Sequence, residues 1–102
     1  MIESTTWPAK HPGERVTAEF DFGPGLAAGD PLASVQLLVT TVQGVDAAPG
    51  ALVYGAMQIK GARAFVQLQG GLDKCSYRIE CRGTTANNNL LVLARVLPVQ
   101  VN

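Results

Sequence analysis

The feature that most constrains the fold is a two-residue alternation of apolar and polar side chains in short segments bounded by glycine, proline or asparagine. In Ser76–Arg82, the apolar residues Tyr77, Ile79 and Cys81 alternate with serine, arginine and glutamate. This period puts one set of side chains on each face of a β-strand. Val16–Phe22 repeats the pattern. Both segments are therefore expected to be strands with one face buried.

The same reasoning extends along the chain, where turns rich in glycine, proline or asparagine separate the candidate strands. No segment has the apolar stripe of an amphipathic helix. A series of short strands at such spacing is typical of an antiparallel sandwich, so we expect an all-β, Ig-like β-sandwich of about seven strands. The candidate strands are Val16–Phe22, Ser34–Val42, Leu52–Ile59, Arg63–Leu68, Ser76–Arg82 and Leu90–Val101.

The chain is expected to form one domain preceded by an arm. Residues 1–13 contain Pro8 and Pro12 and have no core pattern, which predicts an extended N-terminal arm. Trp7 is the exception, and we expect it to dock on the domain or on a neighbour. Residues 14–102 then make up the Ig-like domain, and the whole chain of 102 residues is near the commonest domain size.

Four side chains are expected to define the fold: Phe20 and Phe22 on the first strand, and Tyr77 and Cys81 on the fifth. Tyr77 stands at the start of the penultimate strand, just after a Gly-Gly turn. In Greek-key sandwiches a tyrosine at this place commonly bonds its hydroxyl group to upstream backbone, forming a tyrosine corner. The alternative is an ordinary core tyrosine.

The segment Gly23–Ala28 fits the loose dinucleotide fingerprint G-x-G-x-x-G/A, and Asp46 follows about twenty residues later, as that fingerprint requires. A dinucleotide loop must lead into a helix whose N–H groups hold the pyrophosphate. Here Gly29–Pro31 follows at once, and a helix cannot run through it. We therefore interpret the segment as a structural corner and expect no cofactor.

No other group of residues has the spacing of a catalytic or metal site. His11 is the single histidine and has no partner at a useful spacing. Cys75 and Cys81 lie on one predicted strand, about 20 Å apart, so they cannot form a disulfide within the chain. Glu19 and Asp21 share one face of a strand, as solvated carboxylates do. We expect no enzymatic activity.

The net charge and the hydropathy of the chain limit the kinds of partner that it is expected to bind. Eight basic residues balance eight acidic ones, which is unlike a domain that binds nucleic acid. No apolar run reaches the roughly 18 residues of a membrane span, and no signal-peptide pattern opens the chain. We therefore expect synthesis in the cytoplasm with reduced cysteines. Apolar residues reach 47% and charged residues only 16%, which favours an oligomer or a surface covered by partners.

The segment Leu90–Leu97 is apolar at nearly every position. A strand with one face on the core and the other in water alternates, and this one does not. One hypothesis is that its second face binds another protein; the alternative is that loops of the same domain cover it. The residues expected at the partner interface are Trp7, His11, Leu91, Leu93 and Leu97.

In order along the chain, several short motifs resemble those of the short Ig-like virion structural proteins of tailed bacteriophages. That family typically has a Lys-Asp-Pro arm, an aromatic-Asp-aromatic strand, a Leu-Ala-x-Gly-Asp corner, a Gly-Gly turn before Tyr-x-Val-x-Cys, and a terminal Leu-Pro-Val. The matching segments are Lys10–Pro12 (KHP), Phe20–Phe22 (FDF), Leu26–Asp30 (LAAGD), Gly70–Gly71, Tyr77–Cys81 (YRIEC) and Leu97–Val99 (LPV).

The resemblance implies a non-enzymatic structural protein of the virion. We expect an Ig-like module attached in many copies to the capsid or to the head–tail neck, where it stabilises or decorates the particle together with other virion proteins. The alternative is a tail- or fibre-associated Ig-like module that contacts the host surface or its glycans. The predicted loops are poor in aromatic residues, which favours the first interpretation.

Overall fold

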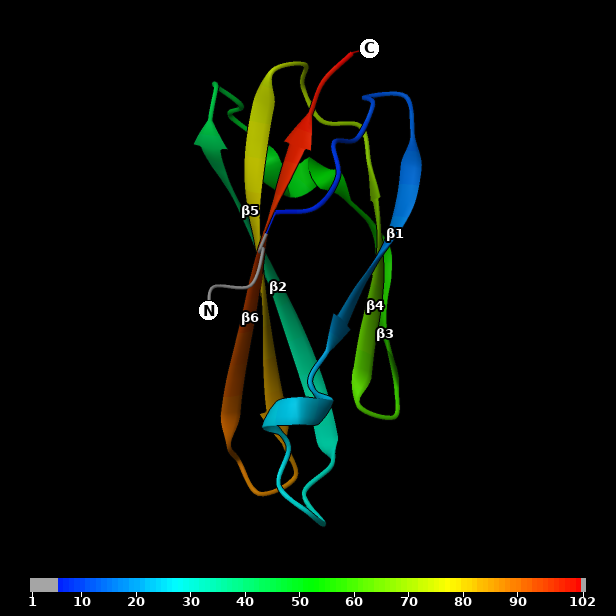
Figure 1. Cartoon of the computed structure of the whole chain (residues 1–102), viewed down its shortest axis with the longest axis vertical. Helices are drawn as coiled ribbons and strands as arrows, with labels where there is room; N and C mark the ends of the chain where they lie inside the picture. Colours follow the sequence, from blue (N-terminus) through cyan, green and yellow to red (C-terminus); the bar gives the residue numbers. More distant parts are fainter. Residues whose placement is uncertain (1–5, 102) are drawn as a thin grey trace.

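A computed structural model describes residues 6–101 of the chain (Figure 1). These residues form six strands and two short 3-10 turns, η1 (Gly23–Gly25) and η2 (Pro49–Leu52), and they contain no α-helix. The strands are β1 (Arg15–Asp21), β2 (Leu32–Gln43), β3 (Val53–Lys60), β4 (Arg63–Gln69), β5 (Cys75–Thr85) and β6 (Leu90–Val99).

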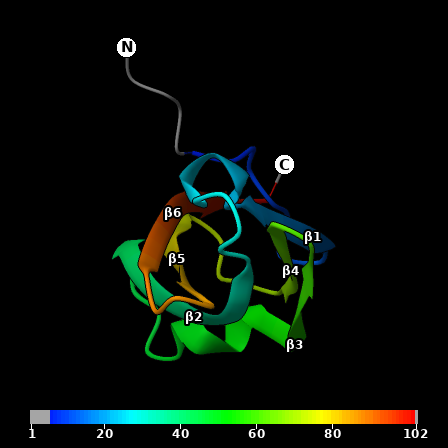
Figure 2. The ribbon, with the colours of Figure 1, turned by 90° about the horizontal axis from the view of Figure 1, so that it is seen from below.

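The strands form two three-stranded sheets, with the orders β1-β4-β3 and β2-β5-β6. Every pair is antiparallel. The two sheets enclose a common core, as Figure 2 shows in the view along the strands. Each of the six candidate segments is a strand, but the expected count of about seven is corrected to six among the described residues.

The segment before β1 does not form a full strand, because its two prolines cannot donate to a ladder. Instead it lies alongside β6 and makes isolated parallel bridges. The backbone N–H of Trp7 donates to the carbonyl of Val96 (2.8 Å), and that of Lys10 to Pro98 (2.9 Å). Of the expected N-terminal arm, residues 1–5 lie outside the described residues.

The core is built from alternate positions of both sheets. On β5, the central strand of its sheet, every odd-numbered residue is buried and every even-numbered one is half-buried or exposed. The alternation predicted for Ser76–Arg82 is thus confirmed. The buried apolar side chains are Ala18, Phe20, Phe22, Leu32, Leu52, Ala64, Val66, Leu68, Cys75, Tyr77, Ile79, Cys81, Leu97 and Val99.

One inward-facing position of β5 is a glycine, because two side chains fill the space beside it. A Cβ atom on Gly83 would stand 2.8 Å from Leu32 Cδ1 and 3.0 Å from Phe22 Cε1. No side chain fits there without movement of the core. The glycine therefore lets the phenyl ring of Phe22 and the start of β2 close over β5.

Candidate functional site

The outer face of the β2-β5-β6 sheet combines apolar and charged side chains. Leu38 of β2 pairs in register with Glu80 of β5, and Glu80 pairs with Ala94 of β6. The large apolar side chains of Leu38, Leu90 and Val92 are 40%, 62% and 49% exposed. This face is therefore partly apolar although it lies on the outside of the molecule. Such a surface is suited to contact with another protein.

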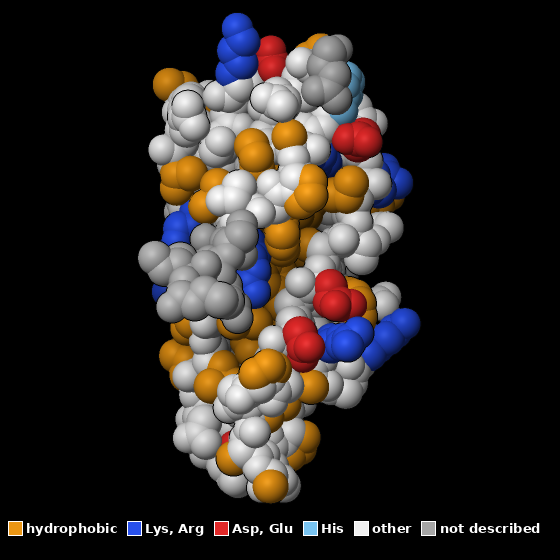
Figure 3. Space-filling model, in the orientation of Figure 1, with side chains coloured by type: hydrophobic (Ala, Val, Ile, Leu, Met, Phe, Trp, Pro, Cys, Tyr) orange, Lys and Arg blue, Asp and Glu red, His pale blue; other side chains and the backbone are white. Residues whose placement is uncertain are grey.

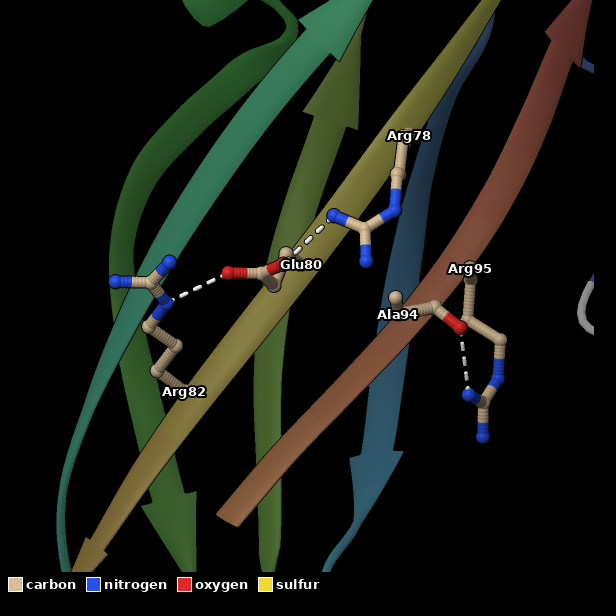
Figure 4. A network of polar contacts seen from close by, with 5 residues as sticks. All are labelled: Arg78, Glu80, Arg82, Ala94 and Arg95. Atoms are coloured by element: carbon tan, nitrogen blue, oxygen red, sulfur yellow. Dashed lines mark hydrogen bonds and ion pairs between the residues drawn. The ribbon is translucent and has the colours of Figure 1, made fainter. Parts of the chain in front are cut away.

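Three charged residues of β5 form a closed ion cluster at the centre of this face (Figure 4). Glu80 accepts hydrogen bonds from Arg78 Nη1 and Arg82 Nε, each 2.6 Å long. The Glu80 side chain is 12% exposed, whereas those of Arg78 and Arg82 are 45% and 43% exposed. The hydrogen bonds from Arg78 and then Arg82 lower the pKa of Glu80. The cluster carries one net positive charge, and its guanidinium groups reach solvent.

The structure places the expected interface residues of β6 at inward-facing positions, and their role in binding a partner stays a prediction. Leu97 lies in the core, and Leu91 and Leu93 are half-buried and pack against it. The reason is register: Leu97 pairs with Tyr77 and Leu93 with Cys81, which are both inward-facing positions of β5. The even-numbered residues of β6 therefore lie on its outer face.

Trp7 and Leu97 nevertheless come together at the open side between β6 and β1. The Trp7 ring packs against Phe20, with 5.5 Å between ring centroids. Trp7 and Leu97 line a hollow with Val16, Ala18 and other residues. Figure 3 shows apolar side chains between the β6 and β1 sides of the molecule. In the part of the chain that the structure describes, Trp7 therefore docks on its own domain.

Lys10 fixes the N-terminal segment, a role that sequence analysis missed. This lysine is only 2% exposed. Its ammonium group donates to the carbonyl oxygens of His11 (2.9 Å) and Gly70 (2.8 Å). Burial lowers the pKa of Lys10, and the charge of Glu14 opposes that shift. Nothing in a polar, proline-containing segment distinguishes such a lysine from a solvated one.

His11 is held in a turn before β1. Its backbone N–H donates to Glu14 Oε1 (2.7 Å), and its Nδ1 atom accepts from the N–H of Gly13 (2.9 Å). The imidazole ring thus stabilises the turn into β1. A role in binding a partner stays a prediction.

Tyr77 and Asp46 form a corner that joins three segments. The Tyr77 hydroxyl donates to Asp46 Oδ2 (2.7 Å) and accepts from the N–H of Leu72 (2.9 Å), five residues upstream. Burial, followed by the Asp46 bond, raises the pKa of Tyr77 to about 12. Asp46 therefore stabilises the fold and is not the acidic residue of a dinucleotide site.

Asp30 performs a similar task at the opposite end of the molecule. It is buried, its Oδ1 accepts from the N–H of Asn87 (2.8 Å), and its Oδ2 accepts from Asn89 Nδ2 (3.0 Å). A hydrogen bond from the Thr85 side chain is the main cause that lowers its pKa. The Gly-Asp corner after η1 is thereby tied to the β5–β6 hairpin. The motif Leu26–Asp30 is visible in the sequence, but the role of Asp30 is not.

The described residues offer few groups that could act as a nucleophile or as metal ligands. Cys75 and Cys81 are both buried and unpaired with each other. Burial raises the pKa of Cys81 to about 11, so its thiol is not an activated nucleophile. Within residues 6–101, no three histidine, cysteine or acidic residues gather as metal ligands would. The described residues also include no helix that could cross a membrane.

The outer face of the β2-β5-β6 sheet is suited to contact with another protein. A comparison with known protein families is consistent with such a role. The model of the family described as podophage GP4 fiber-tail adaptor protein gp77 matches residues 10–98. This chain belongs to that family. A comparison with curated proteins gave no match. As a member of the gp77 family, the chain is a structural protein of the phage virion.

Membership in the gp77 family also bears on the position in the particle. Its description names the fibre and the tail, and this fits the tail- or fibre-associated alternative better than capsid decoration. An adaptor of the tail contacts other virion proteins, as expected for this chain.

Proposed function

We propose that this protein joins a fibre to the phage tail and has no enzymatic activity. The observation that carries the proposal is the family match over residues 10–98, which covers all six strands except the last residue of β6. The described surfaces support it, because they combine exposed apolar and charged groups. Attachment rests on contacts with other virion proteins.

The fold that presents these surfaces is an Ig-like sandwich with an incomplete first strand. Ig domains order their strands A-B-E-D in one sheet and C-F-G in the other. Assigning β1–β6 to B–G gives B-E-D and C-F-G, which are the orders β1-β4-β3 and β2-β5-β6. The N-terminal segment beside β6 then stands in place of strand A.

An adaptor requires two separate surfaces, and the two sheets offer faces of different chemistry. The outer face of the β1-β4-β3 sheet is charged: Arg63 lies 3.6 Å from Glu19 and 3.9 Å from Asp21. The outer face of the β2-β5-β6 sheet is partly apolar around its ion cluster. Each contact is modest, and attachment in several copies converts modest contacts into firm binding through avidity.

A second candidate function is glycan recognition, and one observation favours it. Tyr54, Gln58, Phe65 and Gln67 line a hollow on the outer face of the β1-β4-β3 sheet. Aromatic rings beside amide groups can stack on a sugar and bond its hydroxyl groups. Binding of host surface polysaccharide that is lost in Tyr54→Ala would support this function. No binding by the wild-type chain would exclude it, and equal binding by both proteins would exclude this hollow as the site.

The stoichiometry of purified particles tests the adaptor function. An adaptor occurs in a small number of copies relative to the major capsid protein, because a particle has one tail. A decoration protein occurs in amounts comparable to the capsid protein. Quantitative mass spectrometry of particles separates the two: a ratio near that of the tail proteins supports the adaptor, and a ratio near that of the capsid protein contradicts it.

A further inference from the structure

The four outer strand edges of the described sandwich differ in how they are protected. An edge strand has unpaired N–H and C=O groups, which can pair with another chain unless charges, bulges or covering segments prevent this. The sheet orders put β1 and β3 at the edges of one sheet and β2 and β6 at the edges of the other. Each of these four strands therefore needs a charge, a bulge or a covering segment if its edge is to stay unpaired.

Three of these edges have an evident protection. β1 has the exposed charged residues Arg15, Glu19 and Asp21. β3 has an irregular register between Tyr54 and Gln58, which bends a strand away from a flat pairing surface.

The edge of β6 is covered along most of its length. The N-terminal segment bonds to its second half through Val96 and Pro98. η1 lies beside its first half, where a Cβ atom on Gly25 would stand 3.5 Å from Leu91 Cδ1. Pro98 also removes one donor from the strand.

β2 has neither a charged residue nor, among the described residues, a covering segment bonded to the backbone of its outer edge. Its twelve residues, LASVQLLVTTVQ, include no charged residue, no proline and no glycine. Its register irregularities lie at the two ends, between Leu32 and Ser34 and between Thr41 and Gln43. The stretch Ser34–Thr41 between them is regular. η2 and β3 contact β2, but β5 is its only ladder partner among the described strands.

We propose that the edge of β2 pairs antiparallel with β2 of a second copy, which makes a dimer with a continuous six-stranded sheet. Two-fold pairing brings every residue of a strand against a residue of the same strand. A charge beside the two-fold axis therefore meets the same charge of the copy, which is unfavourable. β2 has no charge to repel its copy, so a second copy fits this edge without an electrostatic cost.

The outward side chains of β2 fit the same arrangement. A two-fold axis beside Leu38 puts this leucine against its own copy and Gln36 against Thr40, all on the outer face of the joined sheet. Leu38 is 40% exposed in the single chain. Pairing covers it with an equal apolar side chain. The proposal deepens the adaptor function, because a dimer presents each outer face twice.

Sedimentation equilibrium of the wild-type chain and of Leu38→Lys tests the pairing. The contact is small, so we expect a weak dimer that is populated at about 0.1–1 mM. Leu38→Lys puts two ammonium groups opposite each other and is expected to weaken dimerisation at least about tenfold. Thr17→Lys adds the same charge to the β1 edge and leaves dimerisation unchanged. If Leu38→Lys fails to fold, as judged by circular dichroism, Leu38→Arg takes its place, because it also puts two positive charges opposite each other.

Cysteine cross-linking identifies the surface directly. Leu38→Cys is expected to form a disulfide-linked dimer under mild oxidation, whereas Thr17→Cys stays monomeric, and the buried Cys75 and Cys81 contribute no background. A wild-type chain that is monomeric throughout this concentration range overturns the proposal. So does a dimer that persists in Leu38→Lys, or equal cross-linking of both cysteine variants. The stoichiometry of the particle is independent of these results, so the adaptor function and the dimer can fail separately.

Discussion

The hydroxyl group of Tyr77 donates a 2.7 Å hydrogen bond to Asp46 Oδ2 and also accepts one from the backbone N–H of Leu72. Tyr77 is fully buried, at 0% exposure. One phenol group thus fixes the loop after β2 and the turn before β5 against the core. This corner sits at the same end of the molecule as the N-terminal segment (Figure 1).

Tyr77→Phe is expected to lower the free energy of unfolding by about 1–3 kcal/mol, because it leaves the Leu72 N–H and Asp46 without their partner. Urea denaturation measures the change. Tyr54→Phe is the matched control: Tyr54 is 40% exposed and contacts Arg15 through its ring, which phenylalanine keeps. Equal effects of the two substitutions would contradict a structural role of the Tyr77 hydroxyl.

Gly83→Ala is expected to destabilise the domain by about 1–3 kcal/mol, because the added methyl group meets Leu32 and Phe22 in a filled core. Gly50→Ala serves as the control, since a Cβ atom there meets nothing within 4 Å. Thermal unfolding compares them. The packing account fails if Gly83→Ala is as stable as the wild type.

Glu80→Gln is expected to lower stability at pH 7 and to have a smaller effect at pH 3. The two arginines hold the folded-state pKa of Glu80 below that of the unfolded chain. The carboxylate therefore contributes stability above the unfolded pKa of about 4.3, and this contribution is lost as the pH falls through the folded-state value. Urea denaturation at both pH values measures it.

The exposed carboxylate of Glu19, 3.6 Å from Arg63, provides the comparison for Glu80. Glu19→Gln is expected to change stability little at either pH, because an exposed ion pair contributes little. A loss of stability in Glu80→Gln that is the same at pH 3 and pH 7 would show that the cluster does not act through charge.

Lys10→Met is expected to loosen the N-terminal segment, because the carbonyl oxygen of Gly70 loses its donor. The single tryptophan, Trp7, reports on this segment, and its fluorescence should shift to longer wavelength as the ring leaves Phe20. Lys60→Met changes an exposed lysine and should leave the emission unchanged. An identical spectrum for Lys10→Met and wild type would show that other contacts hold the segment.

The six strands could be predicted because alternation and turn residues are local signals. On β5 even the buried face followed from sequence, since Tyr77, Ile79 and Cys81 contrast with charged neighbours. On β6 both faces are apolar, so the pattern could not tell which residues face inward. Pairing of Leu97 with Tyr77 decides it, and that register is a property of two strands.

The polar contacts of the candidate surfaces were harder to predict. Lys10, Asp30 and Asp46 each bond to groups more than ten residues away in the sequence, and no local pattern shows such a partner. The Arg78–Glu80–Arg82 cluster lies within one strand, where the alternation already puts its three charged side chains on one face. The unprotected edge of β2 became evident only once the sheet order was known.

The most direct test of the adaptor function is electron microscopy of particles produced without this chain. The account predicts heads and tails of normal appearance that lack fibres, and recovery of the fibres when the wild-type chain is supplied from a plasmid. Particles that keep a full set of fibres but have unstable heads would contradict it and would assign the protein to the capsid.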